Sequence, residues 1–350
     1  MDILITLRRI IYLCLFISFI SIISCENLLL GPEPKNTPVD NFEILWKDFD
    51  RYYALFDVMK VNWDSLYAVY RPQVNNNMSY IDIWNIFVNI LAPFRDSHIL
   101  ISNKAGTWYF DPRCFSDKGD FSLYTIKKIY LQNNFLTAGE GNITYGKIPG
   151  HQIGYIYIST FIGNNIKWSK EIDNVIQYLQ DTKGIILDIR DNHGGYMENA
   201  DNIASCFFER NVDYLKQKFR NGPGHSDFEP FQNFTLNIRE DSKHYYNKTA
   251  VLTNRGTASA SDRFNWLFKY YRNNNICIGD TTSGCFGQAF QYRVLPDGYI
   301  YSFTVSLVTS MEGRIALDSV GGTPPDIPVL NKNNGLIDSV MENAIRHIEQ

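Results

Sequence analysis

A serine with chemical potential lies in a short run of small and polar residues, Asn254 to Asp262, which reads Asn-Arg-Gly-Thr-Ala-Ser-Ala-Ser-Asp. An apolar strand-like segment precedes the run, and an aromatic-rich helical pattern follows it. This order predicts that Ser259 lies at the first turn of a helix. There, free backbone N–H groups and the helix dipole stabilise a developing oxyanion, which suits a nucleophile. The alternative is a capping box, in which Ser259 and Asp262 only cap the helix.

Three further segments carry residues that suit a catalytic site. Paired glycines, Gly194 and Gly195, follow a buried strand-like segment, and such a turn brings backbone N–H groups close to a ligand. His98 follows an acid and a hydroxyl in Arg95-Asp96-Ser97-His98, a setting that can orient and tune a general base. Asp318 precedes a second glycine pair and could orient a base. Each segment also has a structural interpretation, as a turn, a helix end or a surface residue.

Together, these segments resemble the C-terminal (tail-specific) processing peptidases and the tricorn protease core. The family shows a strand followed by Leu-Asp-x-Arg-x-Asn-x-Gly-Gly, which 187–195 match, and a nucleophile segment that 254–262 match. Further family segments follow in the same order, at 278–284, 295–298 and 322–326. The similarity extends from Phe42 to about Val329. It implies a crotonase/ClpP-like mixed β-sheet with helices.

The resemblance implies a role for each matched residue. Ser259 would be the nucleophile, and the N–H groups of Gly195 and Ala260 would form the oxyanion hole. The processing-peptidase branch uses a lysine as base, but the corresponding position here is Cys285. The tricorn-like branch uses a Ser-His pair and a C-terminal acid instead.

In that branch, His98 would be the general base and Ser97 would orient its ring. Asp318 stands where the family has Glu, and it would polarise the site. His193 is the alternative base. The stretch between His98 and Gly154 is too short for a PDZ domain as well as the connecting strands, so substrate selection is expected to come from the helical domain or the loops, and C-terminal specificity is not assumed.

The N-terminus resembles a bacterial lipoprotein signal. Arg8 and Arg9 precede the apolar run Ile10–Ile23, which is short for a membrane span, and Cys25 follows Ser24. We expect residues 1–25 to be the signal peptide, with Cys25 as the lipidated residue, and residues 26–40 to be a tether. The alternative is an uncleaved signal anchor. The first reading predicts a lipid-anchored protein of the cell envelope, on the periplasmic face of a membrane or at the cell surface.

Periodicity predicts an α/β protein preceded by a small helical domain. Apolar residues repeat at helical spacing over 42–56, 63–70 and 79–93, which gives a helical N-terminal domain at 41–103. Alternating strand and helix patterns then predict a catalytic domain at 104–350. The apolar segment 121–130 is expected to be a strand. The polar stretch 211–248 is expected to be an irregular excursion from the sheet.

Composition limits the partners. A formal net charge of -4 and the lack of a basic block argue against nucleic acid. No metal-binding or cofactor motif is present, so neither a metal nor a cofactor is expected. Cys277 and Cys285 are the nearest candidates for a disulfide, with free thiols as the alternative. The expected function is a serine endopeptidase acting on peptides or unfolded proteins; the alternative is a non-catalytic peptide- or lipid-binding module. The oligomeric state is left open.

Overall fold

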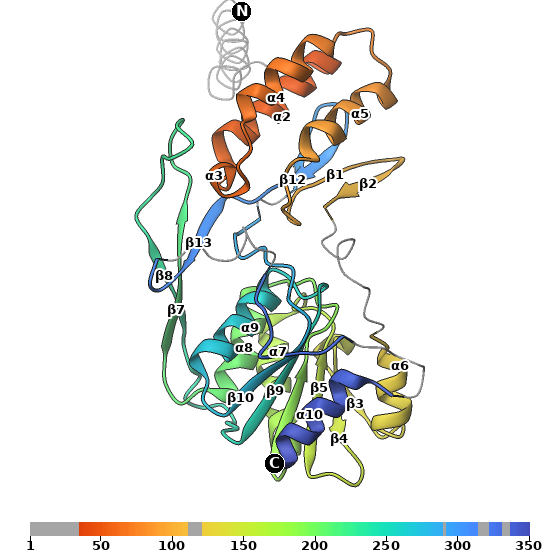
Figure 1. Ribbon diagram of the computed structural model, residues 1–350, viewed down its shortest axis with the longest axis vertical. Coiled ribbons are helices and arrows are strands. Elements are labelled where there is room, and N and C mark those ends of the chain that lie inside the picture. The colour runs from red at the N-terminus through yellow and green to blue at the C-terminus, as the bar shows by residue number, and fades with distance from the viewer. Residues whose placement is uncertain (1–34, 111–120, 290–291, 314–321, 331–336) are drawn as a thin grey trace, which may run out of the picture.

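The computed structural model describes residues 35–110, 121–289, 292–313, 322–330 and 337–350 (Figure 1). Cys25 and Asp318 lie outside these ranges, as do the predicted signal peptide and most of the tether. None of the helices in the described ranges combines the length and the hydropathy that a membrane span requires.

The predicted N-terminal helices are present. They are α2 (Pro38–Tyr52), α3 (Phe56–Met59), α4 (Trp63–Tyr70), η1 (Arg71–Gln73) and α5 (Tyr80–Leu91). Helix α5 begins with a capping box, because the Ser79 side chain bonds the Asp82 N–H and the Asp82 carboxylate bonds the Ser79 N–H. The apolar stripes of these helices pack together around buried aromatic rings such as Phe49 and Phe94.

These helices pack on a small antiparallel sheet that joins two distant parts of the chain. Its strand order is β11-β12-β1-β2. Strands β1 (Leu100–Asn103) and β2 (Gly106–Tyr109) follow the helices, whereas β11 (Arg293–Val294) and β12 (Ile300–Ser302) come from nearly 200 residues later. The buried side chains of both parts form one hydrophobic cluster. The helical unit is therefore completed by residues from the C-terminal part of the chain.

A seven-stranded mixed sheet forms the lower part of the molecule in Figure 1. Its strands, in spatial order, are β14 (Ile327–Pro328), β10 (Asn275–Gly279), β9 (Lys248–Thr253), β6 (Gly184–Asp188), β5 (Ile153–Ile158), β4 (Ile143–Lys147) and β3 (Leu136–Ala138). The pairs from β14 to β5 are parallel, and β4 and β3 are antiparallel to their neighbours. The mixed α/β fold that the sequence predicts is confirmed.

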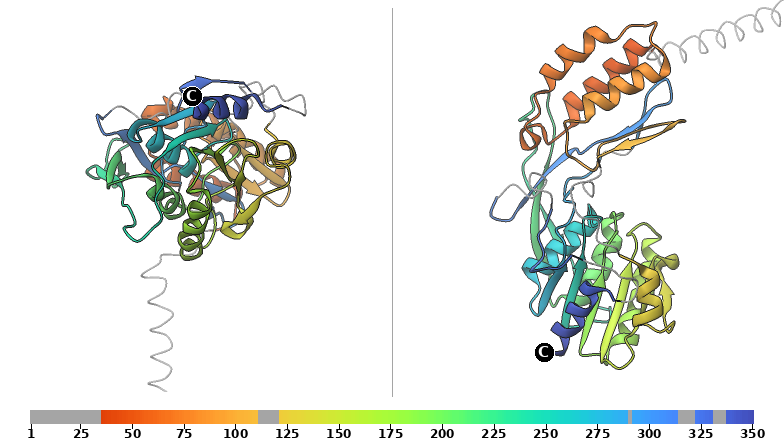
Figure 2. Two further views of the ribbon diagram at one scale, coloured as in Figure 1. Left: turned by 90° about the horizontal axis from the view of Figure 1, so that it is seen from below. Right: turned by 45° about the vertical axis from the view of Figure 1, so that its right-hand side comes forward.

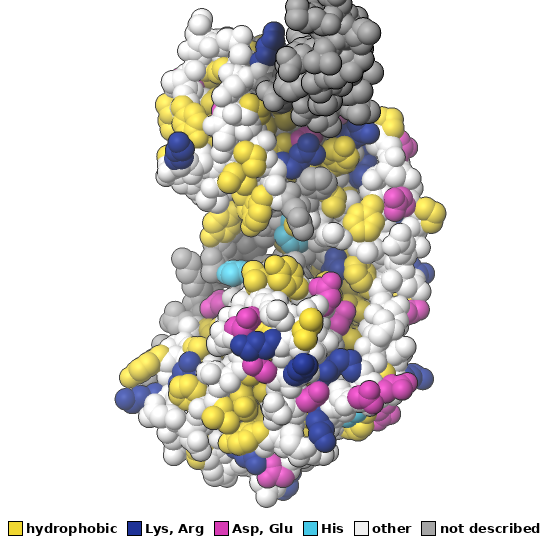
Figure 3. Space-filling view, turned by 180° about the vertical axis from the view of Figure 1, so that it is seen from behind, with side chains coloured by type: hydrophobic (Ala, Val, Ile, Leu, Met, Phe, Trp, Pro, Cys, Tyr) yellow, Lys and Arg dark blue, Asp and Glu magenta, His cyan; other side chains and the backbone are white. Residues whose placement is uncertain are grey.

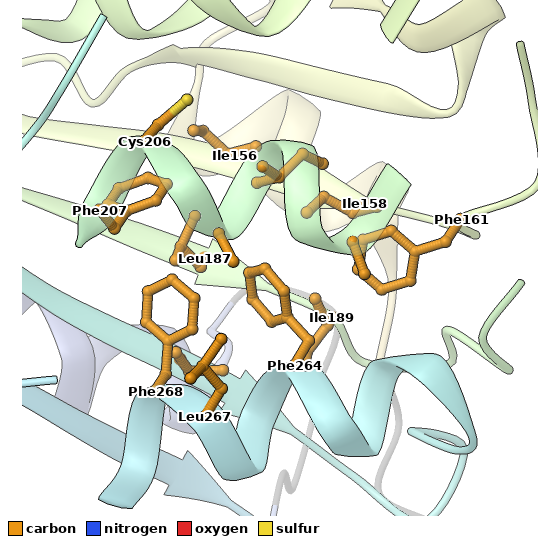
Figure 4. Close-up of a cluster of buried hydrophobic side chains, with 14 of the residues drawn as sticks. Ile156, Ile158, Phe161, Leu187, Ile189, Cys206, Phe207, Phe264, Leu267 and Phe268 are labelled. Atoms are coloured by element: carbon orange, nitrogen blue, oxygen red, sulfur yellow. The ribbon is translucent and has the colours of Figure 1, made fainter. Parts of the chain in front are cut away.

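Helices cover both faces of this sheet (Figure 2). One face carries α7 (Asn165–Leu179), α8 (Met197–Ala204), η5 (Ser205–Phe207) and α9 (Ala260–Tyr271). Figure 4 shows Phe264 and Phe268 of α9 meeting Leu187 of β6 and Phe207 in the core of this face. The opposite face carries α10 (Ser339–Glu349) and the α6–η3 segment (Leu123–Thr125 and Ile126–Tyr130), and η4 (Gly139–Gly141) follows β3.

Two sequence expectations are wrong. Residues 123–130 are helical, not a strand, because their apolar side chains Ile126 and Tyr130 are four apart and face the same core. The stretch 211–248 contains β7 (Val212–Phe219) and β8 (Gln232–Leu236), which form a three-stranded sheet with β13 (Ser306–Ser310). These strands reach from the lower part to the N-terminal helices (Figure 1). Their side chains are mostly half-exposed or exposed, so their sequence lacks a clear apolar pattern.

Candidate active site

Ser259 lies between the parallel strand β9 and helix α9. Its backbone has φ 58° and ψ −122°, which is a strained conformation for a residue with a side chain. Its own N–H donates to the Gly284 carbonyl oxygen at 3.1 Å. A strand, a sharp turn and a helix that starts directly after the serine are typical of an exposed nucleophile.

The alternative interpretation of Ser259 and Asp262, a capping box, is wrong. Ser259 is the N-cap residue of α9, but its hydroxyl makes no capping hydrogen bond. Asp262 instead accepts hydrogen bonds from the hydroxyls of Thr282 and Thr323 and from the N–H of Gly284, all at 2.6 Å. Burial raises the pKa of Asp262 to about 7, against the effect of these donors. Through these hydrogen bonds, the Asp262 carboxyl holds the 282–284 loop. The Ser259 hydroxyl makes no capping bond and is left for other chemistry.

The glycine-rich loop after β6 lies directly against Ser259. A Cβ atom added to Gly194 would come within 2.8 Å of the Ser259 Cβ, and Gly194 has a positive φ of 98°. Asn192 fixes the loop, since its side-chain amide donates to the Ile158 carbonyl and its side-chain oxygen accepts from the Gly194 N–H. Its carbonyl accepts from the N–H of Ala258, which precedes the serine.

A second asparagine joins the same two segments. The Asn254 side-chain oxygen accepts from the N–H groups of Asp191 and Gly256, and its amide donates to the Asp191 carboxylate. The asparagines of the two motifs are thus structural: they hold the glycine loop and the serine turn in one arrangement.

Two backbone N–H groups beside the serine are not used by the fold. Among the described residues, neither the N–H of Gly195 nor that of Ala260 has a hydrogen-bond acceptor. Ala260 is the first residue of α9, and Gly195 is the partner of Phe161 in an isolated parallel bridge. Donors of this kind match what an oxyanion hole needs. The predicted assignment of Gly195 and Ala260 therefore agrees with where the two residues lie, and their role stays a prediction.

His98 lies in the turn between α5 and β1. Its N–H donates to the Asp96 carboxylate at 2.9 Å, and its Nδ1 is 3.3 Å from the Thr304 hydroxyl oxygen. Thr304 in turn donates to the buried Asp96 carboxylate at 2.7 Å. Because the one hydrogen of this hydroxyl points to Asp96, its oxygen faces the ring as an acceptor. The contact therefore favours the tautomer with hydrogen on Nδ1 and a lone pair on Nε2.

The surroundings of His98 keep its ring neutral. Burial is the largest influence and lowers the pKa of His98 below its usual 6.5. The positive charge of Arg263 lowers the pKa further, and the negative charge of Asp96 raises it. A neutral imidazole is the form that accepts a proton.

The other predicted polar residues lie elsewhere or have different neighbours. The Ser97 hydroxyl is buried, and no hydrogen-bond partner for it exists in the described part of the chain. Thr304, which the sequence did not single out, makes the contact to the ring that Ser97 was expected to make. His193 is exposed in the loop beside Gly194. The role of Asp318 stays a prediction, since the residue lies outside the described ranges.

The Gly284–Cys285 segment connects the serine and histidine sides. Gly284 forms an isolated parallel bridge with Ala258, next to Ser259. The Cys285 sulfur lies 3.8 Å from an oxygen of the Asp96 carboxylate. A ring nitrogen of His98, an Asp96 carboxylate oxygen and the Cys285 sulfur all lie within 4.8 Å of one another. Cys285 and Cys277 are not joined to each other, so the candidate disulfide is not formed. Figure 3 shows a hollow between the upper and lower parts of the molecule, bordered by hydrophobic and histidine side chains.

The fold and these residues define a class of mixed α/β proteins with a serine at a strand-to-helix turn and unbonded N–H groups beside it. The model of peptidase family S41 matches residues 152–329, which are 178 of the 350 residues. The chain therefore belongs to peptidase family S41. The model of the tricorn protease C1 domain matches residues 34–92, which hold the N-terminal helices.

Individual relatives agree with this family. The chain is 26% identical over 162 residues to the carboxy-terminal processing protease CtpB of Bacillus subtilis and 27% identical over 203 residues to CtpA of the same species. These matches cover 43% and 53% of this chain but only 28% and 40% of the relatives, so the chain matches less than half of their length. The crystal structure of a candidate peptidase from Parabacteroides merdae is 26% identical, with a TM-score of 0.79, and 90% of this chain and 98% of that chain are covered.

Proposed function

We propose that this protein is a serine endopeptidase whose nucleophile is Ser259 and whose general base is His98. The observation that carries the proposal is the pairing of a strained, uncapped serine with two unbonded N–H groups, those of Gly195 and Ala260. Membership of peptidase family S41 supports the same chemistry.

In the proposed reaction, Nε2 of His98 takes the proton of the Ser259 hydroxyl as its oxygen attacks the peptide carbonyl carbon. The carbonyl oxygen becomes negatively charged and accepts hydrogen bonds from the N–H groups of Gly195 and Ala260. His98 then gives its proton to the leaving amine, which leaves an acyl group on Ser259. Water hydrolyses this ester, again with His98 as base.

Asp96 and Thr304 support this assignment because they hold the ring of His98 in the required tautomer. Ser97 and Asp318 are the residues that the family resemblance implies for orientation and polarisation. We retain Asp318 in that role and assign the orientation of the ring to Thr304.

We further propose that the protein is exported and held at the cell envelope by a lipid on Cys25, where it acts on exported peptides or unfolded proteins. The apolar run that ends just before Cys25 supports this placement. The test is incorporation of labelled palmitate in the producing cell. Cys25→Ala should abolish incorporation, with Cys14→Ala as the matched control; label retained in Cys25→Ala would refute the anchor.

The catalytic proposal is tested by labelling with a fluorophosphonate probe, which reacts with activated serines. Wild-type protein should be labelled, and both Ser259→Ala and His98→Ala should lose the label. Ser261→Ala is the matched control, since Ser261 lies two residues away and its buried hydroxyl has no partner among the described residues. If His98→Ala is labelled normally and His193→Ala is not, the base is His193. A wild-type protein that binds peptides but is never labelled would favour the alternative, a non-catalytic binding module.

A further inference from the structure

Three metal-binding side chains meet beside the proposed base. One potential ligand atom each from Asp96, His98 and Cys285 lies within 4.8 Å of the others. Asp96 and His98 belong to the turn after α5, and Cys285 belongs to the loop after β10, 189 positions after Asp96. In the described ranges this is the one group of three such residues. Sequence spacing cannot reveal it, because the fold alone brings the two segments together.

The ligand types suit zinc. Zn²⁺ binds carboxylate oxygen, imidazole nitrogen and thiolate sulfur at about 2.0–2.3 Å, and its sites often have three protein ligands with water at the fourth position. In a tetrahedron with such bonds, the ligand atoms lie roughly 3.5 Å apart. The Cys285 sulfur and the Asp96 oxygen are already 3.8 Å apart. The largest distance between two of these ligand atoms, which is at most 4.8 Å, therefore has to shorten by only about 1 Å. Small side-chain rotations can provide this change.

Asp96 is held in place for such a role. Its carboxylate accepts hydrogen bonds from the His98 N–H and from the Thr304 hydroxyl. Hydrogen bonds of this kind orient metal ligands and strengthen binding. The Asp96 carboxylate is therefore already fixed, and zinc binding does not cost conformational entropy at this side chain.

The charges also balance. Zn²⁺ binding to Cys285 releases the thiol proton to solvent, so the occupied site holds one dication, the Asp96 carboxylate and one thiolate, with a net charge of zero. The positive charge of Arg263 acts on His98, so it would repel a zinc ion whose charge the ligands did not neutralise. Its guanidinium group donates to the Phe286 carbonyl and lies 4.2 Å from the Phe234 ring centroid. A neutral occupied site limits the repulsion from this guanidinium.

We propose that Asp96, His98 and Cys285 form a Zn²⁺ site and that zinc inhibits the enzyme reversibly. A neutral imidazole has one nitrogen lone pair in the ring plane and carries a hydrogen on its other nitrogen. Coordination to zinc occupies that lone pair, so the His98 ring has no site left to accept the Ser259 proton. Metal binding is independent of the peptidase proposal, whereas the inhibition rests on it.

Binding is tested in the full-length Ser259→Ala protein, where no activity is needed. Co²⁺ serves as a spectroscopic substitute for Zn²⁺, because a cobalt–thiolate bond gives a strong near-ultraviolet absorption. We expect this absorption on titration, its loss on adding Zn²⁺, and a decrease in Zn²⁺ affinity of at least about 100-fold in Cys285→Ala. Cys277→Ala is the matched control and should retain the absorption, since Cys277 is a buried free thiol outside the group.

Asp96→Asn provides a second variant, which should weaken binding but keep the thiolate absorption. Absence of the absorption in the parent protein, or its persistence in Cys285→Ala, would overturn the site. Inhibition is then measured in wild-type protein by fluorophosphonate labelling over a Zn²⁺ series. We expect labelling to fall over the range in which zinc binds and to return with a chelator. Binding without inhibition of an active wild type would overturn the inhibitory role, whereas a wild type that is never labelled would refute the peptidase proposal and leave the binding result standing.

Discussion

Thr304 donates a 2.7 Å hydrogen bond to the carboxylate of Asp96, and both residues are buried. The same hydroxyl accepts from the proposed base, so it connects His98 to a buried negative charge. Thr304 lies between β12 and β13, where the chain passes from the N-terminal unit to the three-stranded sheet. A residue far along the chain thus sets the tautomer of the histidine.

Replacing Thr304 with valine should lower kcat by roughly 10- to 100-fold with little change in KM, because the ring loses its preference for hydrogen on Nδ1. Thr304→Ser should restore most of the activity. Steady-state hydrolysis of an unfolded protein substrate measures both constants.

Thr309→Val is the matched control. Thr309 is also a buried threonine, and its hydroxyl has no partner among the described residues. Equal losses in Thr304→Val and Thr309→Val would mean that the effect is one of packing and would contradict the orienting role.

The pH dependence of kcat/KM should show an acid limb with a midpoint below 6.5. The active form has neutral His98, and burial lowers the pKa of this group, so the base stays unprotonated at lower pH than an exposed histidine would. Asp96→Asn removes the negative charge that raises the pKa of His98, and the limb should move to still lower pH. A limb that moves upward in Asp96→Asn would show that the titrating group is not His98.

Much of the fold follows from local sequence patterns. The stripe of apolar residues from Phe42 to Phe56 and the Ser79–Asp82 capping box are contained within single helices, and the helices are present. The ordered motifs around Gly195 and Ser259 likewise predict two loops that the structure brings together.

Other features depend on contacts between distant residues. Thr304 and His98 are 206 positions apart, and no local signal distinguishes this threonine from others. Strand β12 belongs to the N-terminal sheet because it pairs with β1, which lies about 200 residues earlier in the chain. Helical periodicity predicts α2 from one stretch of chain, whereas strand pairing requires the partner to be known.

A buried charge cluster fixes the start of the glycine loop. The Arg190 guanidinium pairs with Asp188 at 2.6 Å and with Asp338 at 2.8 Å, and all three side chains are almost fully buried. Arg190→Met should lower the free energy of unfolding by about 3–5 kcal/mol, because two buried carboxylates lose their cation. Urea denaturation measures this change.

Lys147→Met is the control for charge loss at the surface. Lys147 pairs with the exposed Asp181, and removal of that pair should leave the unfolding free energy almost unchanged. Similar effects of the two substitutions would show that the Arg190 cluster contributes no more than a surface pair.

The contact between Gly194 and Ser259 makes the sharpest test of the loop geometry. Gly194→Ala should reduce fluorophosphonate labelling by more than about 100-fold, because even a misplacement of roughly 1 Å can cost this much. The new methyl group would lie 2.8 Å from the Ser259 Cβ and must displace either the serine or the glycine loop. Part of the effect comes from backbone strain, since alanine is disfavoured at the Gly194 φ of 98°.

Gly150→Ala separates the two causes. Gly150 also has a positive φ, 81°, but nothing lies within 4 Å of its added Cβ. Backbone strain should lower the free energy of unfolding by about 1 kcal/mol in both variants, and the steric clash adds to this loss in Gly194→Ala. Only Gly194→Ala should lose labelling. If Gly194→Ala is labelled as fast as Gly150→Ala, the glycine loop does not position the nucleophile, and Gly195 is not placed to bind the oxyanion.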